Sequence, residues 1–105
     1  MRILLVDDHD QVREATRRVL ERDGHEVTAV ASVNDALQLL DETDVLVTDW
    51  TLAGNGAGLV EDARGLGIAT VVCAGAAPPD CSADEVVAKG DTARLLAAVR
   101  RVGGA

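Results

Sequence analysis

Short aliphatic runs alternate along the chain with segments in which apolar residues recur at helical spacing. The first run is ILLV at residues 3–6, and further runs follow at residues 26–30, 45–48, 70–73 and 85–88. A continuous aliphatic run of this length is typical of a strand that is buried on both faces of a parallel sheet. We therefore expect five strands.

Helical patterns fill the gaps between the expected strands. In residues 10–22 the apolar positions share one face, with Arg and Glu on the other. Ser32 is a suitable N-cap for a short second helix. A Gly-rich loop at residues 54–58 leads to a third helix near residues 59–64, and Thr92 can cap a last helix. The apolar positions expected in the short second helix are Ala36, Leu37, Leu39 and Leu40.

This alternation predicts an α/β fold, in which helices cover both faces of a parallel sheet. We expect the flavodoxin-like, doubly wound five-stranded order 2-1-3-4-5, in which strands 1 and 3 lie side by side. Such sheets bind their ligands outside the carboxyl ends of the strands. Asp7 and Asp8 end the first expected strand and Asp49 ends the third. The three carboxylates should therefore meet in one crevice.

Size and composition fit one domain that spans residues 1–105. The net charge of −8 argues against direct nucleic-acid binding, which needs a positive surface. No apolar run approaches the roughly 20 residues of a membrane span. Cys73 and Cys81 lack the spacing of metal or redox motifs. We expect a soluble, cytoplasmic protein with reduced thiols and no membrane association.

Three carboxylates in one crevice repel one another unless a pKa rises or a hard cation binds between them. Mg²⁺ suits this position, because it accepts one or two carboxylates and takes phosphate oxygens among its other ligands. A carboxylate beside the cation can attack phosphorus and become an acyl phosphate. The alternative is structural, since Asp7, Asp8 or Asp10 can cap the following helix. Three acids at the ends of buried strands favour the functional interpretation.

Three segments carry a resemblance to a known family: ILLVDDH at residues 3–9, VLVTDWTLAG at residues 45–54 and VVAKG at residues 86–90. Together they resemble the receiver domain of two-component response regulators, along nearly the full length of the chain. The resemblance implies a stand-alone receiver that takes a phosphoryl group from a histidine kinase or a histidine phosphotransfer protein. It also implies a downstream protein target, whose identity the sequence does not give.

The resemblance assigns roles to individual residues. Asp49 takes the phosphoryl group, Asp8 is a direct Mg²⁺ ligand, and Asp7 binds the metal through water. The backbone carbonyl of Thr51 completes the metal site, and Lys89 pairs with the phosphoryl oxygens. The role of Lys89 also follows from its position, because a lysine after a short buried strand can extend along the sheet end into the crevice. Such a protein phosphorylates and dephosphorylates itself and is not a turnover enzyme in the usual sense.

Several positions depart from the family pattern. The Ser or Thr that usually ends the fourth strand aligns with Ala74, or with Cys73 if the alignment shifts by one, and the usual aromatic residue is Val86. Residues 76–82 read AAPPDCS, in which Pro-Pro opposes a helix, so we expect the fourth helix of the family to be missing or reduced. Gly90 replaces the proline after the lysine, and we expect a trans bond there.

These departures leave three functions to compare. The first is a phosphoacceptor with atypical output switching, and the second is a pseudo-receiver that binds partner proteins independently of phosphorylation. The third, an aspartate-nucleophile phosphatase, needs an acid two residues after the nucleophile, where this chain has Thr51. His9 and His25 receive no role, and His25 is expected at the surface. Trp50, next to Asp49, is a candidate fluorescent reporter.

Overall fold

A computed structural model describes residues 1–50, 56–75 and 82–104 of the chain. Its single sheet has five parallel strands in the order β2-β1-β3-β4-β5, which confirms the predicted topology. The strands are β1 (Arg2–Val6), β2 (Glu26–Val30), β3 (Val45–Asp49), β4 (Ala69–Ala74) and β5 (Glu85–Ala88). The carboxyl ends of β1 and β3 therefore lie side by side, as the site requires.

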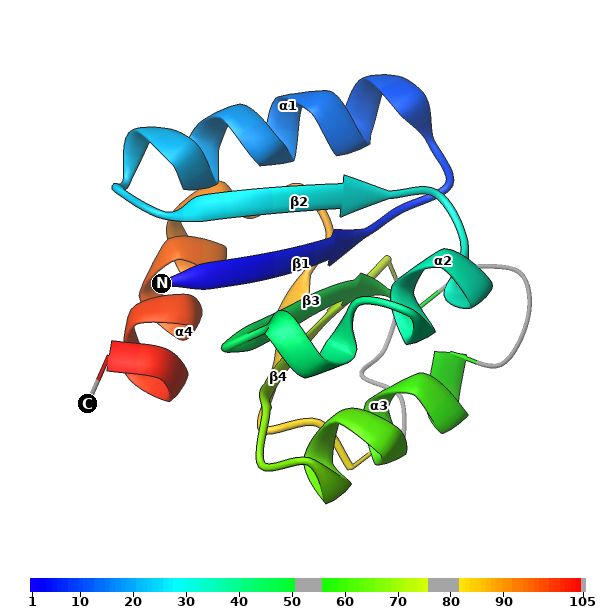
Figure 1. The fold of residues 1–105 in the computed structure, drawn as a ribbon. Helices are drawn as coiled ribbons and strands as arrows, with labels where there is room; N and C mark the ends of the chain where they lie inside the picture. Colours follow the sequence, from blue (N-terminus) through cyan, green and yellow to red (C-terminus); the bar gives the residue numbers. More distant parts are fainter. Residues whose placement is uncertain (51–55, 76–81, 105) are drawn as a thin grey trace.

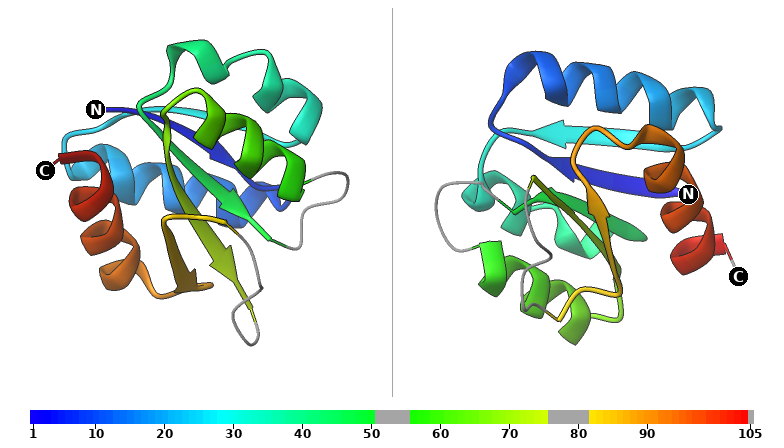
Figure 2. Two further views of the ribbon diagram at one scale, coloured as in Figure 1. Left: turned by 90° about the horizontal axis from the view of Figure 1, so that it is seen from below. Right: turned by 180° about the vertical axis from the view of Figure 1, so that it is seen from behind.

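Helices cover both faces of this sheet. They are α1 (Asp10–Arg22), α2 (Val33–Leu37), α3 (Gly56–Gly65) and α4 (Thr92–Gly104), with a short 3₁₀ helix η1 (Leu40–Glu42) before β3. Figures 1 and 2 show α1 and α4 on one face and α2 and α3 on the other. No helix in the described part of the chain is long and apolar enough to cross a membrane.

Aliphatic side chains form a separate core on each face of the sheet. On the face of α1 and α4, the buried side chains include Ile3, Leu5, Leu20, Val45, Val47, Val71, Leu95 and Val99. On the opposite face they include Leu4, Val6, Val33, Ala36, Leu46, Leu59, Ala63 and Ile68. Successive residues of a strand point to opposite faces, so the continuous run in β1 supplies both cores. Each fully buried Leu, Ile or Val contributes about 1.5–3 kcal/mol relative to an exposed one.

Helix boundaries differ from the sequence prediction at two places. α3 begins at Gly56, so the second half of the expected Gly-rich loop is helical. α2 ends at Leu37, whose side chain is exposed instead of lying in the core. The next apolar positions lie outside α2: Leu39 is the N-cap residue of the 3₁₀ helix η1, and Leu40 is its first residue and is buried.

The caps of two helices test the remaining boundary predictions. Ser32 caps α2 as predicted, because its hydroxyl accepts a hydrogen bond from the Asp35 N–H at 3.2 Å. The prediction for Thr92 is wrong, since this residue is already the first of α4. Asp91 caps this helix, and its carboxylate accepts the Arg94 N–H at 3.1 Å.

The predicted loss of the family's fourth helix is not confirmed. Four α-helices are present among the described residues, and the last of them, α4, follows β5. The fourth helix of a receiver would lie between β4 and β5, where residues 76–81 fall outside the described part. The expectation about this segment stays a prediction.

Candidate functional site

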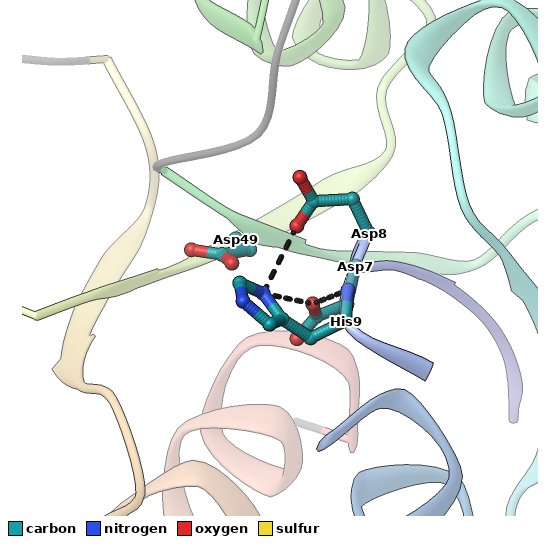
Figure 3. A group of neighbouring side chains, drawn as sticks. All are labelled: Asp7, Asp8, His9 and Asp49. Carbon is teal, nitrogen blue, oxygen red and sulfur yellow. Dashed lines mark hydrogen bonds and ion pairs between the residues drawn. The ribbon is translucent and has the colours of Figure 1, made fainter. Parts of the chain in front are cut away.

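The acidic residues converge because two neighbouring strands end together. Asp7 follows Val6, whose register partner in β3 is Thr48, so Asp7 and Asp49 end up next to each other. Asp8 and His9 continue the chain from Asp7 toward α1. One side-chain ligand atom from each of Asp7, Asp8, His9 and Asp49 lies within 4.8 Å of the others (Figure 3).

Asp7 is held in place by a set of short local contacts. Its carboxylate accepts the backbone N–H of His9 at 2.9 Å, and its own N–H donates to the Val30 carbonyl at 3.1 Å. The guanidinium of Arg13 donates to the Asp7 carbonyl at 2.9 Å and to Asp10 at 2.8 Å. Sequence reasoning missed Arg13, because only the first turn of α1 brings its side chain back to the strand end.

The local contacts also test the alternative that these acids are present only to cap the following helix. The N-cap residue of α1 is His9, and no side chain caps this helix. The carboxylate of Asp10 pairs with Arg13. The Asp7 side chain is 7% exposed and the Asp8 side chain 41% exposed, so one acid is buried and the other faces solvent. Helix capping therefore does not account for the acidic residues at this strand end.

Lys89 reaches the acidic cluster from β5. Its ammonium donates to the Asp49 carboxylate at 2.7 Å, and the Asp49 side chain is only 2% exposed. The hydrogen bond to Asp49 is the main cause that raises the pKa of Lys89, so the side chain is a cation at neutral pH. Gly90 has a φ of 88° and the Lys89–Gly90 bond is trans, as predicted. A proline could not adopt this φ, so glycine permits a different path for the chain.

Of the other predicted positions, the structure describes Ala74, Val86 and Cys73. Thr51 is outside the described residues. Ala74 ends β4 opposite Ala88, and Val86 lies within β5. Cys73 is the register partner of Asp49, and it lines a cavity with Asp49 and Lys89. Burial, together with the charges of the nearby carboxylates, raises the pKa of its thiol to about 12.

The two histidines differ from the sequence prediction. His9 belongs to the cluster, since its Nδ1 lies 3.2 Å from Asp8 Oδ1 and 3.8 Å from Asp7 Oδ1. The prediction that His25 lies at the surface is wrong, because its side chain is only 8% exposed. The His25 ring is placed beside Asp23, whose carboxylate pairs with Arg100 of α4. Adjacency to an acid pair was the one sequence signal that pointed to His9.

The cluster combines excess negative charge with convergent oxygen donors. Asp7, Asp8 and Asp49 bring three carboxylates together, and the ammonium of Lys89 pairs with one of them, Asp49. Carboxylate oxygens are the ligands that hard divalent cations such as Mg²⁺ prefer. The donor set therefore fits such a cation.

Comparison with known proteins identifies the family. The family model of the response regulator receiver domain matches residues 3–100 of this chain. The chain belongs to this family. A CheY-like receiver domain from Methanospirillum hungatei JF-1 is 26% identical, with a TM-score of 0.84 over 95% of this chain and 90% of that one. In the present chain, the acidic cluster of Asp7, Asp8 and Asp49 is consistent with a phosphoacceptor site.

Two further relatives show how far the likeness extends. The response regulator TrrA from Thermotoga maritima, in complex with Mg²⁺–BeF, is 24% identical, with a TM-score of 0.87 and coverage of 96% of this chain and 97% of that one. This likeness shows the fold. The transcriptional regulatory protein AfsQ1 of Streptomyces coelicolor is 43% identical over 54 residues. That match spans 50% of this receiver domain and only 24% of AfsQ1.

Proposed function

We propose that this chain is one receiver domain that accepts a phosphoryl group on Asp49 in a Mg²⁺-dependent reaction. The donor is a phosphohistidine of a histidine kinase or of a histidine phosphotransfer protein. The observation that carries the proposal is the Lys89–Asp49 contact at 2.7 Å, beside the carboxylates of Asp7 and Asp8. TrrA, a protein of this fold, is in complex with Mg²⁺–BeF, which supports a Mg²⁺ site here.

The proposed step transfers the phosphoryl group between two nucleophiles. A carboxylate oxygen of Asp49 attacks phosphorus, and the phosphorus–nitrogen bond of the donor breaks. Its electron pair returns to the imidazole nitrogen, which takes a proton, and Asp49 becomes an acyl phosphate. Water later hydrolyses this acyl phosphate and restores the carboxylate.

The residues around Asp49 have distinct roles in this step. Asp7, Asp8, Asp49 and the backbone carbonyl of Thr51 would hold Mg²⁺, and the bound ion would offset charge on the phosphoryl oxygens. Lys89 is 27% exposed, so its ammonium can move from the Asp49 carboxylate to an incoming phosphoryl oxygen. Asp49 is almost fully buried, so Lys89 must shift before the donor can approach.

Mass measurement after incubation with a small phosphodonor tests the proposal. Wild type with Mg²⁺ and acetyl phosphate should gain one phosphoryl group, and the gain should disappear with a chelator or in Asp49→Asn. Lys89→Ala should gain it at least tenfold more slowly, while Asp41→Asn, at an exposed aspartate, serves as a matched control. No adduct on wild type, or an undiminished adduct on Asp49→Asn, would refute the proposal.

Output from this receiver is proposed to be atypical. Ala74 has no hydroxyl to bind the phosphoryl group, and Val86 has no aromatic ring to rotate with it. The Pro-Pro pair at residues 78–79 also supports a missing or reduced fourth helix. The downstream protein target must therefore recognise a surface change of another kind.

A pseudo-receiver that binds its partner regardless of phosphorylation is the second candidate. The same two positions, Ala74 and Val86, favour it, because they remove the usual link between the acceptor and the surface. The affinity for an isolated partner, measured with and without phosphoryl on Asp49, separates the two. A tenfold change, about 1.4 kcal/mol, supports the phosphorylation-dependent receiver. Equal affinity in both states supports the pseudo-receiver.

A further inference from the structure

We propose that His9 sets the metal preference of this site by adding an imidazole nitrogen to the carboxylate ligands. The inference rests on the proposed cation site at Asp7, Asp8 and Asp49. It predicts that the chain binds divalent cations with nitrogen affinity, such as Ni²⁺ and Co²⁺, more tightly than carboxylates alone would allow.

The backbone of His9 fixes where its ring can lie. Its N–H donates to the Asp7 carboxylate at 2.9 Å, and its carbonyl accepts the Arg13 N–H at 2.8 Å. Although His9 is the N-cap residue of α1, its side chain does not cap the helix. Figure 3 shows the ring among the carboxylates of Asp7, Asp8 and Asp49, with Nδ1 facing the first two.

The distances suit shared coordination of one cation. In an octahedral site with bonds of about 2.1 Å, adjacent ligand atoms lie about 3.0 Å apart and opposite ones about 4.2 Å apart. The His9 Nδ1 lies 3.2 Å from Asp8 and 3.8 Å from Asp7, which falls within this range. The whole set spans up to 4.8 Å, and the exposed side chains of Asp8 and His9 can rotate to close the difference.

Ligand chemistry makes the effect selective. Mg²⁺ prefers oxygen ligands and keeps several waters, so the loss of an imidazole should hardly affect its binding. Imidazole suits later first-row metals, whose affinity for nitrogen rises toward nickel and copper. Removing the His9 ring should therefore weaken the binding of Ni²⁺ and Co²⁺ but leave the binding of Mg²⁺ nearly unchanged.

Calorimetric titration of the untagged chain with Mg²⁺ and Ni²⁺ tests this inference. In His9→Asn, the dissociation constant for Ni²⁺ should rise about tenfold or more, while that for Mg²⁺ should change less than about threefold. His25→Asn removes the other histidine of the chain and is the matched control, with folding checked by circular dichroism. Co²⁺ bound to wild type should also show a visible spectrum that shifts when His9 is replaced.

Two outcomes would overturn the inference. One is an unchanged Ni²⁺ affinity in His9→Asn, which would make the ring only a local partner of Asp8. The other is an equal loss of affinity for Ni²⁺ and Mg²⁺, which would make His9 a structural support of the acid pair. Failure of the proposed function looks different: wild type binds Ni²⁺ through His9 but gains no phosphoryl group from acetyl phosphate.

Discussion

At the scale of single residues, burial separates the carboxylates of the cluster into two kinds. The side chains of Asp7 and Asp49 are 7% and 2% exposed, whereas that of Asp8 is 41% exposed. A buried charge destabilises the fold unless a partner compensates it. For Asp49 the ammonium of Lys89 is such a partner, so this pair serves the fold as well as the proposed chemistry.

Replacement of Lys89 should therefore lower the stability of the fold. We expect Lys89→Ala to reduce the free energy of unfolding by about 1–3 kcal/mol, because Asp49 then remains buried without this cation. Urea titration of the metal-free chain measures the change. Arg94→Ala, which removes an exposed pair with Asp91, is the control and should shift stability by only about 0.5 kcal/mol. Equal effects of the two substitutions would contradict the argument.

The thiol of Cys73 should be unreactive in the folded protein. Its pKa is raised to about 12, so almost none of it is thiolate near neutral pH. In Cys81→Ser, which leaves Cys73 as the only cysteine, reaction with a disulfide reagent at pH 8 should be slower than for a model thiol by about a hundredfold or more. Denaturant should restore ordinary reactivity, and rapid labelling without denaturant would show that the thiol is accessible and ionised.

At the scale of elements, the start of α4 links the fold to the site. Lys89 and Asp91 flank Gly90, so the turn that brings Lys89 to Asp49 also supplies the cap of α4. The positive φ of Gly90 makes both contacts possible, because other residues rarely adopt that backbone conformation. Propensity alone did not separate Asp91 from Thr92, since both residue types are good N-caps.

Cap substitutions distinguish these two neighbours. Asp91→Ala should reduce the free energy of unfolding by about 1 kcal/mol, because the Arg94 N–H loses its acceptor. Thr92→Ala should change it by about 0.5 kcal/mol or less, since Thr92 is the first helical residue. Asp91→Asn keeps a capping oxygen and should fall between them. Thermal and urea unfolding measure all three, and a larger effect at Thr92 would restore the sequence-based assignment.

At the scale of the whole molecule, one carboxylate joins three elements at the amino ends of the strands. Asp84 precedes β5, accepts the N–H of Thr70 in β4 at 2.9 Å, and pairs with Arg64 of α3. Burial by itself raises the pKa of Asp84, but the Thr70 and Arg64 contacts outweigh it and lower the pKa below the ordinary value. This connection holds the edge of the sheet against α3.

The lowered pKa sets the sign of a pH dependence. Between the two pKa values, the unfolded chain binds more protons at Asp84 than the folded one. The contribution of ionised Asp84 to the free energy of unfolding is therefore complete above the ordinary aspartate pKa of about 3.9. It is lost as the pH falls through the lower pKa of the folded state. Asp84→Asn should be less stable than wild type at pH 6, and the difference should shrink below about pH 4.

Urea unfolding at several pH values measures that difference. Asp62→Asn, at an exposed aspartate of α3, is the matched control and should follow wild type more closely. A difference between Asp84→Asn and wild type that stays constant from pH 6 to pH 3 would show that ionisation of Asp84 does not carry the effect.

The sequence by itself determined the plan of the fold and most of the candidate site. Aliphatic runs long enough for buried strands, separated by helical patterns, require a parallel sheet with two covered faces. Asp7 and Asp49 then follow from their positions at strand ends, because parallel strands bring these ends to one edge. Both features are encoded locally, because a run of aliphatic residues and the acid that follows it are adjacent in the sequence.

Only the tertiary structure decided the contacts that join distant or irregular segments. The hydrogen bond from Lys89 to Asp49 joins residues that are 40 positions apart in the sequence, and it depends on the backbone conformation of Gly90. The entry of His9 into the cluster depends on the turn between β1 and α1. The burial of His25 beside Asp23, which pairs with Arg100 of α4, also depends on the tertiary structure. Side-chain directions in turns follow from backbone angles and packing, and no periodic pattern encodes them.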